Sequence, residues 1–237
     1  MSALDDLLDV QEHDTAADQL RHKQATLPER AVVAEGTAEM ARLEAVIAEV
    51  AERVHAVRRE QKKREDEVAL LEARWGELDR TLYSGSVTAP KELQALQEEQ
   101  GVIRRRQSRL EDEVLEHMEQ AEPLDEQVAA RTAERDAADE RVKAALVALA
   151  EAEAGIDAEL ATVEAERAVT AKGIPDELLA EYDQIRSQLG GIGAAKLHGV
   201  TCSGCNLGLP AVVVDRIRKM GPDEVVHCEE CGRILVR

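Results

Sequence analysis

Apolar residues recur at alternating steps of three and four along two long stretches of the chain, residues 40–82 and residues 93–128. This spacing keeps one face of a helix against a partner helix, and it predicts coiled-coil packing. The sequence YSGSVTAP at residues 83–90 separates the stretches, and its Gly85 and Pro90 end any helix. Two helices joined by so short a break are expected to fold back antiparallel as a hairpin.

The apolar positions also predict how the two helices align. We call the apolar face of each stretch its seam. Pairing the stretches around the break places Arg64 beside Gln107, at the only strongly polar part of the first seam. Polar residues in such a seam cost stability but fix alignment. The predicted partners are Leu78 with Leu93, Trp75 with Leu96, Val68 with Ile103, Val57 with Val114, and Leu43 with Val128.

The second stretch continues past the start of the first, with apolar positions as far as Val163. Its expected cover is residues 3–27, which end at a break where Pro28 kinks a helix or begins a new one. The N-terminal segment fits the heptad poorly, so a splayed end, a bent end and pairing with a second chain all stay open. Pro175 predicts the start of a third helix, and the glycine-rich residues 190–193 predict its end and a hinge.

The composition agrees with long helices joined by a narrow seam. The 237 residues include no Phe, one Trp and two Tyr, and a third of them are charged, with a formal net charge of −19. No apolar run approaches the roughly 20 residues of a membrane span. The acidic N-terminus does not resemble an export signal. We therefore expect a cytoplasmic protein with no membrane contact, as a monomer or a homodimer.

The strongest chemical signal is a pair of identical motifs near the C-terminus, Cys202-x-x-Cys205 and Cys228-x-x-Cys231. They supply the four thiolates that a tetrahedral zinc ion needs. Two disulfides or a redox-active pair are alternatives, but without export thiols stay reduced, and no βαβ pattern surrounds either motif. We predict one structural Zn²⁺. Four protein ligands leave no open position for water, so catalysis by the metal is not expected.

Other residues near the cysteines refine the prediction. Gly204 is expected to relax the first turn, and Gly232 follows the second, where a positive φ is often needed. His198 and His227 could in principle replace a cysteine, but we interpret them as neighbours of the site or as surface residues.

The segment 194–237 reads as a zinc ribbon with a helical insert. Pro210 favours a short helix over 212–219 that stops at Gly221-Pro222, and residues 224–227 and 233–236 read as strands. So small a segment cannot bury enough core alone, and zinc is expected to contribute on the order of 10 kcal/mol. Chelation is then predicted to unfold 194–237 and spare the rest.

The chain is mainly α, and we predict three parts. Residues 1–173 form the antiparallel coiled-coil hairpin with its tip at 83–90, residues 174–193 form a connecting helix and glycine hinge, and residues 194–237 form the four-cysteine zinc ribbon.

Three stretches carry a resemblance to a known family: LYSGSVTAPKELQALQEE, IPDELLAEYDQIRSQLGGIGAAKLHGVTCSGCNLGLP and VVHCEECGRILVR. The chain resembles the bacterial coiled-coil proteins that end in a four-cysteine zinc ribbon, long catalogued as a domain of unknown function. The resemblance implies a hooked helical hairpin with the four cysteines as zinc ligands. Some relatives are linked to flagellar or type III export components and to an alternative sigma factor, as adaptors or chaperones, and RNA binding has also been proposed. The family usually has an aromatic residue near its end, where this chain has Leu235-Val236-Arg237.

A non-enzymatic adaptor that binds protein partners through stalk, tip and ribbon fits these features best. The candidate tip contacts are Tyr83, Ser84, Val87 and Pro90. The sequence has no nucleophile elbow and no phosphate-binding loop, so an enzyme is not expected.

The alternative function is nucleic-acid binding through the ribbon. Residues 1–193 carry a net charge of −20 and residues 194–237 a net charge of +1, so only the ribbon could meet phosphate. The candidate contacts are Arg216, Arg218, Lys219 and Arg233. The ribbon has no aromatic residue to stack a base, which disfavours this alternative.

Overall fold

A computed structural model describes residues 2–221 and 224–237 of the chain. The chain divides into two compact units: Met1–Ala31 with Ala145–Arg237, and Val32–Ala144. The 82-residue helix α3 (Pro90–Ala171) contributes to both. No described helix is both long and apolar enough to cross a membrane.

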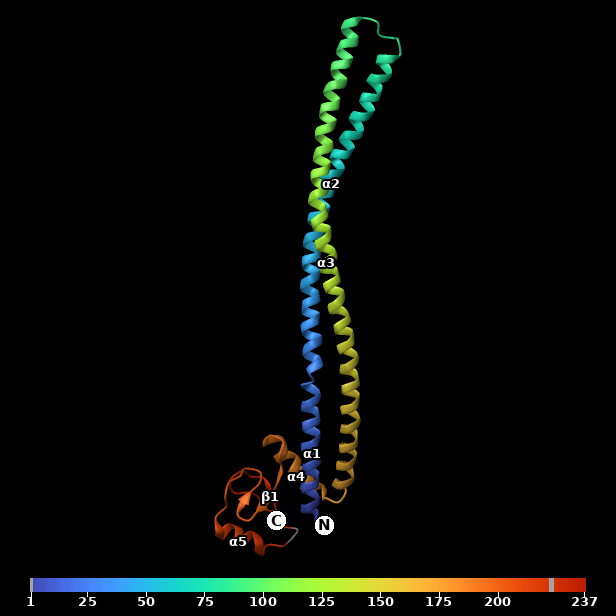
Figure 1. Cartoon of the computed structure of the whole chain (residues 1–237). Coiled ribbons are helices and arrows are strands. Elements are labelled where there is room, and N and C mark those ends of the chain that lie inside the picture. Colours follow the sequence, from blue (N-terminus) through green and yellow to red (C-terminus); the bar gives the residue numbers. More distant parts are fainter. Residues whose placement is uncertain (1, 222–223) are drawn as a thin grey trace. The chain divides into compact units, whose positions relative to one another are not determined.

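The unit Val32–Ala144 is a helical hairpin. Helix α2 (Pro28–Tyr83) runs antiparallel to α3, and residues 84–89 connect them (Figure 1). Pro28 and Pro90 are the first residues of their helices, where a missing N–H removes no helical hydrogen bond. The predicted antiparallel hairpin and its break at YSGSVTAP are confirmed, and of the two alternatives at Pro28 the structure shows the start of a new helix.

The predicted alignment of the two helices is wrong by about one heptad. Leu124 packs with Val50 and Val54, whereas the predicted register would face it with Ile47. Gln107 donates to Glu72 (3.3 Å) and does not lie beside Arg64. The seam repeats every seven residues, so a slip of one repeat returns every apolar position to the seam.

Arg64 instead forms ion pairs on the flank of the hairpin. Its Nε lies 2.8 Å from Glu113 on α3, and its Nη1 lies 3.2 Å from Glu67. Similar pairs join the helices at Arg74 with Glu99 (2.9 Å), Arg58 with Asp125 (2.7 Å) and Arg141 with Glu39 (2.8 Å). Charged residues beside a seam select among registers that the apolar repeat leaves equivalent.

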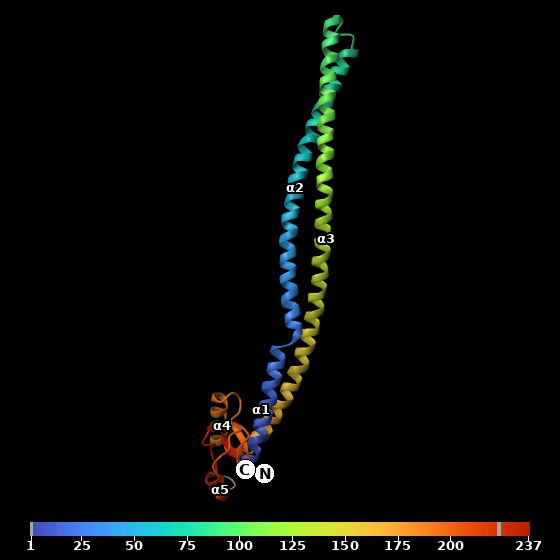
Figure 2. The ribbon, with the colours of Figure 1, turned by 60° about the vertical axis from the view of Figure 1, so that its left-hand side comes forward.

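In the other unit, helix α1 (Ala3–Ala25) lies beside the C-terminal part of α3 (Figure 2). Arg21 pairs with Glu164 (2.7 Å), and Gln24 donates to Asp157 (2.8 Å). This arrangement confirms that the N-terminal segment covers the overhanging part of α3. Ser2 and Asp5 cap the start of α1 reciprocally, which satisfies backbone N–H groups that have no partner in the first turn.

The same unit contains α4 (Asp176–Gln188) and the ribbon. Strands β1 (Ala194–His198), β2 (Thr201–Cys202) and β3 (Ile234–Val236) form a sheet in the order β2-β1-β3. The pair β1–β2 is antiparallel and β1–β3 is parallel. Helix α5 (Ala211–Lys219) lies between β2 and β3 in the chain.

The predicted third helix and the short helix after Pro210 are confirmed as α4 and α5. The strand predicted at 224–227 is wrong, since only an isolated bridge joins His227 to Ile234. The sequence also gave no sign of β1, because Ala-Ala-Lys-Leu-His has low strand propensity and is extended by its partners on both sides. Part of the predicted stop at Gly221-Pro222 lies outside the described residues.

The ribbon and α1 share one hydrophobic core. Leu7 of α1 is completely buried, and its cluster unites α1, α4 and two strands of the sheet. The buried members are Leu4, Leu7, Val10, Ile174, Leu178, Tyr182, Ala194, Ile234 and Val236. The N-terminal helix is therefore part of the structure that supports the ribbon.

A candidate zinc centre built from two equivalent turns

The structure brings the four cysteines together. All four sulfur atoms lie within 4.8 Å of one another, and no other described group of His, Cys, Asp or Glu forms such a cluster. The Sγ atoms of Cys202 and Cys231 are 4.0 Å apart, and those of Cys205 and Cys228 are 3.9 Å apart. A tetrahedral ion with Zn–S distances of 2.3 Å would separate its sulfurs by about 3.8 Å, so the arrangement fits zinc.

The two motifs form equivalent turns. The backbone N–H of Asn206 donates to the carbonyl of Cys202, and that of Gly232 donates to Cys228, both at 2.8 Å. Asn206 and Gly232 each have a positive φ, of 60° and 74°. Asn and Gly are the residues that adopt this conformation most readily. The prediction for Gly232 is confirmed.

Gly204 has a different role from the one predicted. It has no positive φ, and Asn206 adopts that conformation in the first turn instead. A Cβ atom at Gly204 would lie 2.5 Å from Cδ of Arg233 and 3.0 Å from Cβ of Ala195. Glycine is therefore needed here so that two other chain segments can approach the first cysteine turn.

The thiols sit in a low-polarity environment. Cys202 and Cys228 are buried in a cluster that includes Leu209, Ile217 and Leu235. Burial raises the pKa of Cys202, and it raises the pKa of Cys228 to about 12. Burial also opposes ionisation of Cys231, but hydrogen bonds, first that from the Arg233 backbone, lower its pKa to about 7. A bound cation would provide the charge that turns buried thiols into thiolates.

The chemistry of this site is structural. Four cysteines complete the tetrahedral shell of zinc, so none of its positions is left for substrate or water. A zinc ion bound there would join the β2 end of the ribbon to the segment before β3, two parts of the chain that are far apart in sequence. Its binding energy would act directly on the fold of this small segment.

Neither nearby histidine belongs to the sulfur cluster. His227 Nε2 lies 3.0 Å from a carboxylate oxygen of Glu181 on α4. His198 lies exposed in β1. Their positions agree with the interpretation of both as residues outside the ligand set.

The basic candidates for nucleic-acid contact already have partners in the ribbon. Arg216 pairs with Glu229 (2.8 Å), and Lys219 pairs with Asp215 (2.6 Å). Arg218 donates to the carbonyl of Gly199 (3.3 Å). Arg233 donates to the carbonyls of Ile192 (3.0 Å) and Leu189 (2.9 Å). Arg233 thus ties the end of α4 to the cysteine turns.

The tip candidates lie together in and beside the loop between α2 and α3. Tyr83 ends α2 and is 80% exposed, and Pro90 begins α3. The Ser84 hydroxyl donates to the carbonyl of Thr81 (2.8 Å) and lies 2.6 Å from the Ser86 hydroxyl. Val87 is half-buried.

Sequence reasoning missed a polar cluster where α1 meets α4. Gln11 donates to the carbonyl of Gly191 (2.9 Å) and accepts from the N–H of Gly193 (2.7 Å). The segment predicted as a hinge is therefore tied to α1. The available signal was the spacing of Leu4, Leu7, Gln11 and Asp14, which places two polar residues on the apolar face of α1.

Asp14 is the centre of this cluster. Its carboxylate is almost fully buried and accepts from the hydroxyl of Tyr182 (2.8 Å) and from Nε of Arg167 (2.7 Å). Burial, together with the bond to Asp14, raises the pKa of Tyr182. Three helices, α1, α3 and α4, thus meet at one carboxylate.

The fold and the site define a class: a coiled-coil hairpin protein with a structural four-cysteine zinc ribbon. Residues 10–190 match the CT398-like coiled coil hairpin domain, and residues 201–235 match the C4-type zinc ribbon domain. The chain belongs to the CT398-like family. The predicted family, fold class and single zinc ion are confirmed.

Relatives match over nearly the whole chain. An uncharacterized protein of Mycobacterium tuberculosis is 31% identical over 231 residues, which cover 98% of this chain and 94% of the relative. A solved structure from Mycobacterium smegmatis has a TM-score of 0.87 at 26% identity and covers 99% of this chain and 97% of its own. CT398 from Chlamydia trachomatis has a TM-score of 0.70 at 19% identity, with 99% and 97% covered, and so shares the fold.

Proposed function

We propose that this protein is a non-enzymatic adaptor that binds protein partners and uses zinc only to stabilise its ribbon. Both matching families are coiled-coil and zinc-ribbon families, not enzyme families. A coiled-coil hairpin offers long surfaces for binding. The observation that carries the proposal is Tyr83, which exposes 80% of its surface at the end of α2.

Tyr83 is suited to recognition because hydrogen bonds hold the loop beside it. The serine hydroxyls of the loop bond within the loop and to α2, so the loop can hold its conformation before a partner arrives. Exposed tyrosines contribute strongly to protein interfaces because they bury a large area and lose little rotamer freedom. Val87 and Pro90 add apolar surface beside it.

Affinity purification from the native host tests the proposal. The variants Tyr83→Ala and Val87→Asp are expected to lose at least one protein that the natural chain retains. Leu70→Ala is the matched control, because Leu70 is also exposed on α2 but lies away from the tip. If all partners survive both tip variants, the tip is not the binding surface.

A titration with labelled RNA and DNA tests the other function. The low net charge of the ribbon, +1 over residues 194–237, predicts no binding even near roughly 50 mM salt, where phosphate contacts are strong. Binding that is lost in Arg216→Ala would replace the protein-binding proposal with nucleic-acid recognition by the ribbon.

A further inference from the structure

A groove on the hairpin unit lies between α2 and α3 and has a volume of about 370 Å³. Its apolar lining consists of Val68 and Ala69 from α2 and Val114 and Leu115 from α3. Val68 and Val114 are seam residues, yet both remain half-buried. Leu115 is 56% exposed. The seam is thus incompletely covered at this level of the hairpin.

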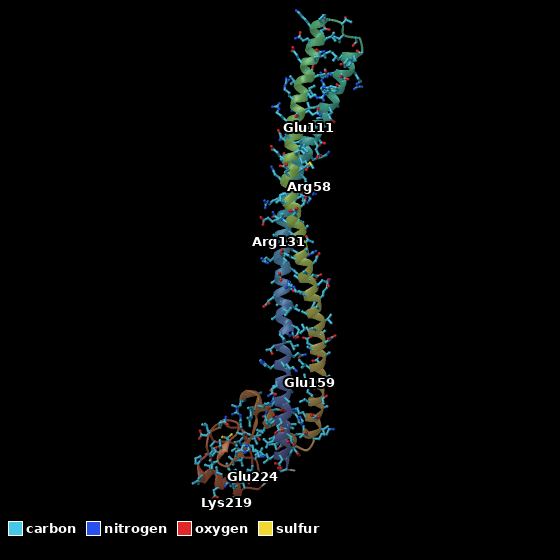
Figure 3. The ribbon with its side chains drawn as sticks, viewed as in Figure 1. Arg58, Glu111, Arg131, Glu159, Lys219 and Glu224 are labelled. Carbon is cyan, nitrogen blue, oxygen red and sulfur yellow. The ribbon has the colours of Figure 1, made fainter. Side chains whose placement is uncertain are left out.

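Three carboxylates line the same groove: Glu65 and Glu72 from α2, and Glu111 from α3, which is labelled in Figure 3. Within the described part of the chain, none of the three has a Lys, Arg or His nitrogen within 4.0 Å. Their side-chain donors are neutral amides: Gln61 donates to Glu65 (2.8 Å), and Gln107 donates to Glu111 (2.7 Å) and Glu72 (3.3 Å).

Carboxylates near the groove in sequence differ in whether they form ion pairs. Asp66, Glu67 and Glu113, which lie beside the groove residues in sequence, all pair with Lys or Arg. Other described hairpin carboxylates, such as Asp112 and Glu116, also form no ion pair, so what distinguishes the three groove glutamates is that they surround one apolar groove. A ligand with both apolar and cationic groups would complement this surface.

We infer that this groove binds a basic amphipathic helix of a partner protein. Apolar residues at steps of three and four would cover Val68, Val114 and Leu115, and flanking Lys or Arg would reach the three glutamates. Ala69 is small enough to let a third helix approach closely. This inference rests on the proposed adaptor function and names the chemical class of one partner.

Other ligand classes fit the groove less well. The hairpin unit contains α2 and α3 without a described strand, so an extended peptide finds no sheet edge there. The three carboxylates would repel phosphates of a nucleic acid. A second copy of this acidic chain would bring further negative charge.

The probe is a fluorescein-labelled synthetic peptide of about 18 residues, or five helical turns, with a leucine stripe flanked by lysines. A scrambled peptide of the same composition and a peptide with glutamate in place of lysine are the controls. Fluorescence anisotropy is expected to show binding of the first peptide and at least about tenfold weaker binding of the others, a difference of about 1.4 kcal/mol.

Variants of the protein locate the binding surface. Leu115→Ser is expected to weaken binding of the lysine peptide at least about tenfold. Leu70→Ser is the matched control, because Leu70 is an exposed leucine outside the groove. Circular dichroism should show an unchanged hairpin for both, since substitutions of exposed residues change stability by about 0.5 kcal/mol or less.

A second pair of variants separates local from diffuse charge. The triple variant Glu65→Gln, Glu72→Gln, Glu111→Gln should reduce both the affinity and its salt dependence. The control triple variant Glu49→Gln, Glu52→Gln, Glu116→Gln removes the same charge from exposed positions outside the groove. Equal loss of affinity in the two triple variants, or none in Leu115→Ser, would overturn the inference.

Two further outcomes distinguish this site from the tip. Tyr83→Ala should leave the peptide affinity unchanged, because Tyr83 does not line the groove. If the peptide binds in the groove but no protein partner is found in the host, the proposed adaptor function is refuted and the groove remains a binding site. A third outcome is a concentration-dependent dimer that the peptide dissociates and that Leu115→Ser abolishes. This outcome would assign the groove to a second copy of the chain and refute binding of a basic helix.

Discussion

Leu7 of α1 tests whether the ribbon and the N-terminal helix unfold together. Its side chain is completely buried in the cluster that contains Tyr182, Ile234 and Val236. Replacing a buried leucine by alanine costs about 2–5 kcal/mol, because it loses apolar contacts and leaves a cavity. With a cost of about 3 kcal/mol and a urea slope of about 1–3 kcal/mol per molar, the unfolding midpoint of this unit should fall by about 1–3 M.

Hydrogen exchange read by mass spectrometry at increasing urea is the assay. In Leu7→Ala, the amides of α1, β1 and β3 should lose protection together, while those of residues 32–144 should not change. Leu70→Ala, at an exposed position of α2, should change stability by about 0.5 kcal/mol or less. Early exchange in α1 with a ribbon that stays protected would refute the shared core.

Other predictions follow from the same contacts. Gly204→Ala should destabilise the ribbon by about 1–3 kcal/mol in thermal unfolding and weaken zinc binding, because its methyl group would overlap a neighbouring arginine. The control Gly208→Ala should be nearly neutral, because its methyl group meets no atom within 4 Å. Asp14→Ala should cost about 2–3 kcal/mol in urea titrations, because an arginine and a buried tyrosine lose a charged acceptor. Elemental analysis of reduced protein should find one zinc per chain, and Cys228→Ser should lower this ratio. The shared core replaces the expectation that chelation unfolds only residues 194–237, and chelation should also increase hydrogen exchange at the amides of α1. Loss of protection confined to the ribbon would contradict the shared core.

The hairpin and the cysteine site could be predicted because local patterns determine both. A seam of apolar residues predicts a helix with a partner, and Gly85 and Pro90 mark where the helix must stop. Two Cys-x-x-Cys turns set the distance between their own sulfurs without help from the rest of the fold. Each of these signals lies within a short stretch of sequence.

The register of the hairpin could not be predicted in the same way. The apolar positions repeat every seven residues, so they fit equally well after a slip of one repeat. The observed alignment pairs Arg58 with Asp125 and Arg74 with Glu99 across the flanks. These pairs are formed by side chains outside the apolar pattern, so the apolar positions alone could not predict them.

The role of α1 was hidden because its decisive residues are polar. Gln11 and Asp14 continue the buried face that Leu4 and Leu7 begin, so the segment has polar residues at positions where an apolar repeat is expected. In the structure these two side chains satisfy the backbone of the glycine segment and the buried hydroxyl of Tyr182. A buried polar group without a partner costs about 1–3 kcal/mol, against a net gain of about 1 kcal/mol for a typical hydrogen bond, so this pairing fixes where α1 must lie. Because α1 also supplies apolar core to the ribbon strands, stabilisation of the ribbon by zinc must extend to α1, which no property of the cysteine motifs could reveal.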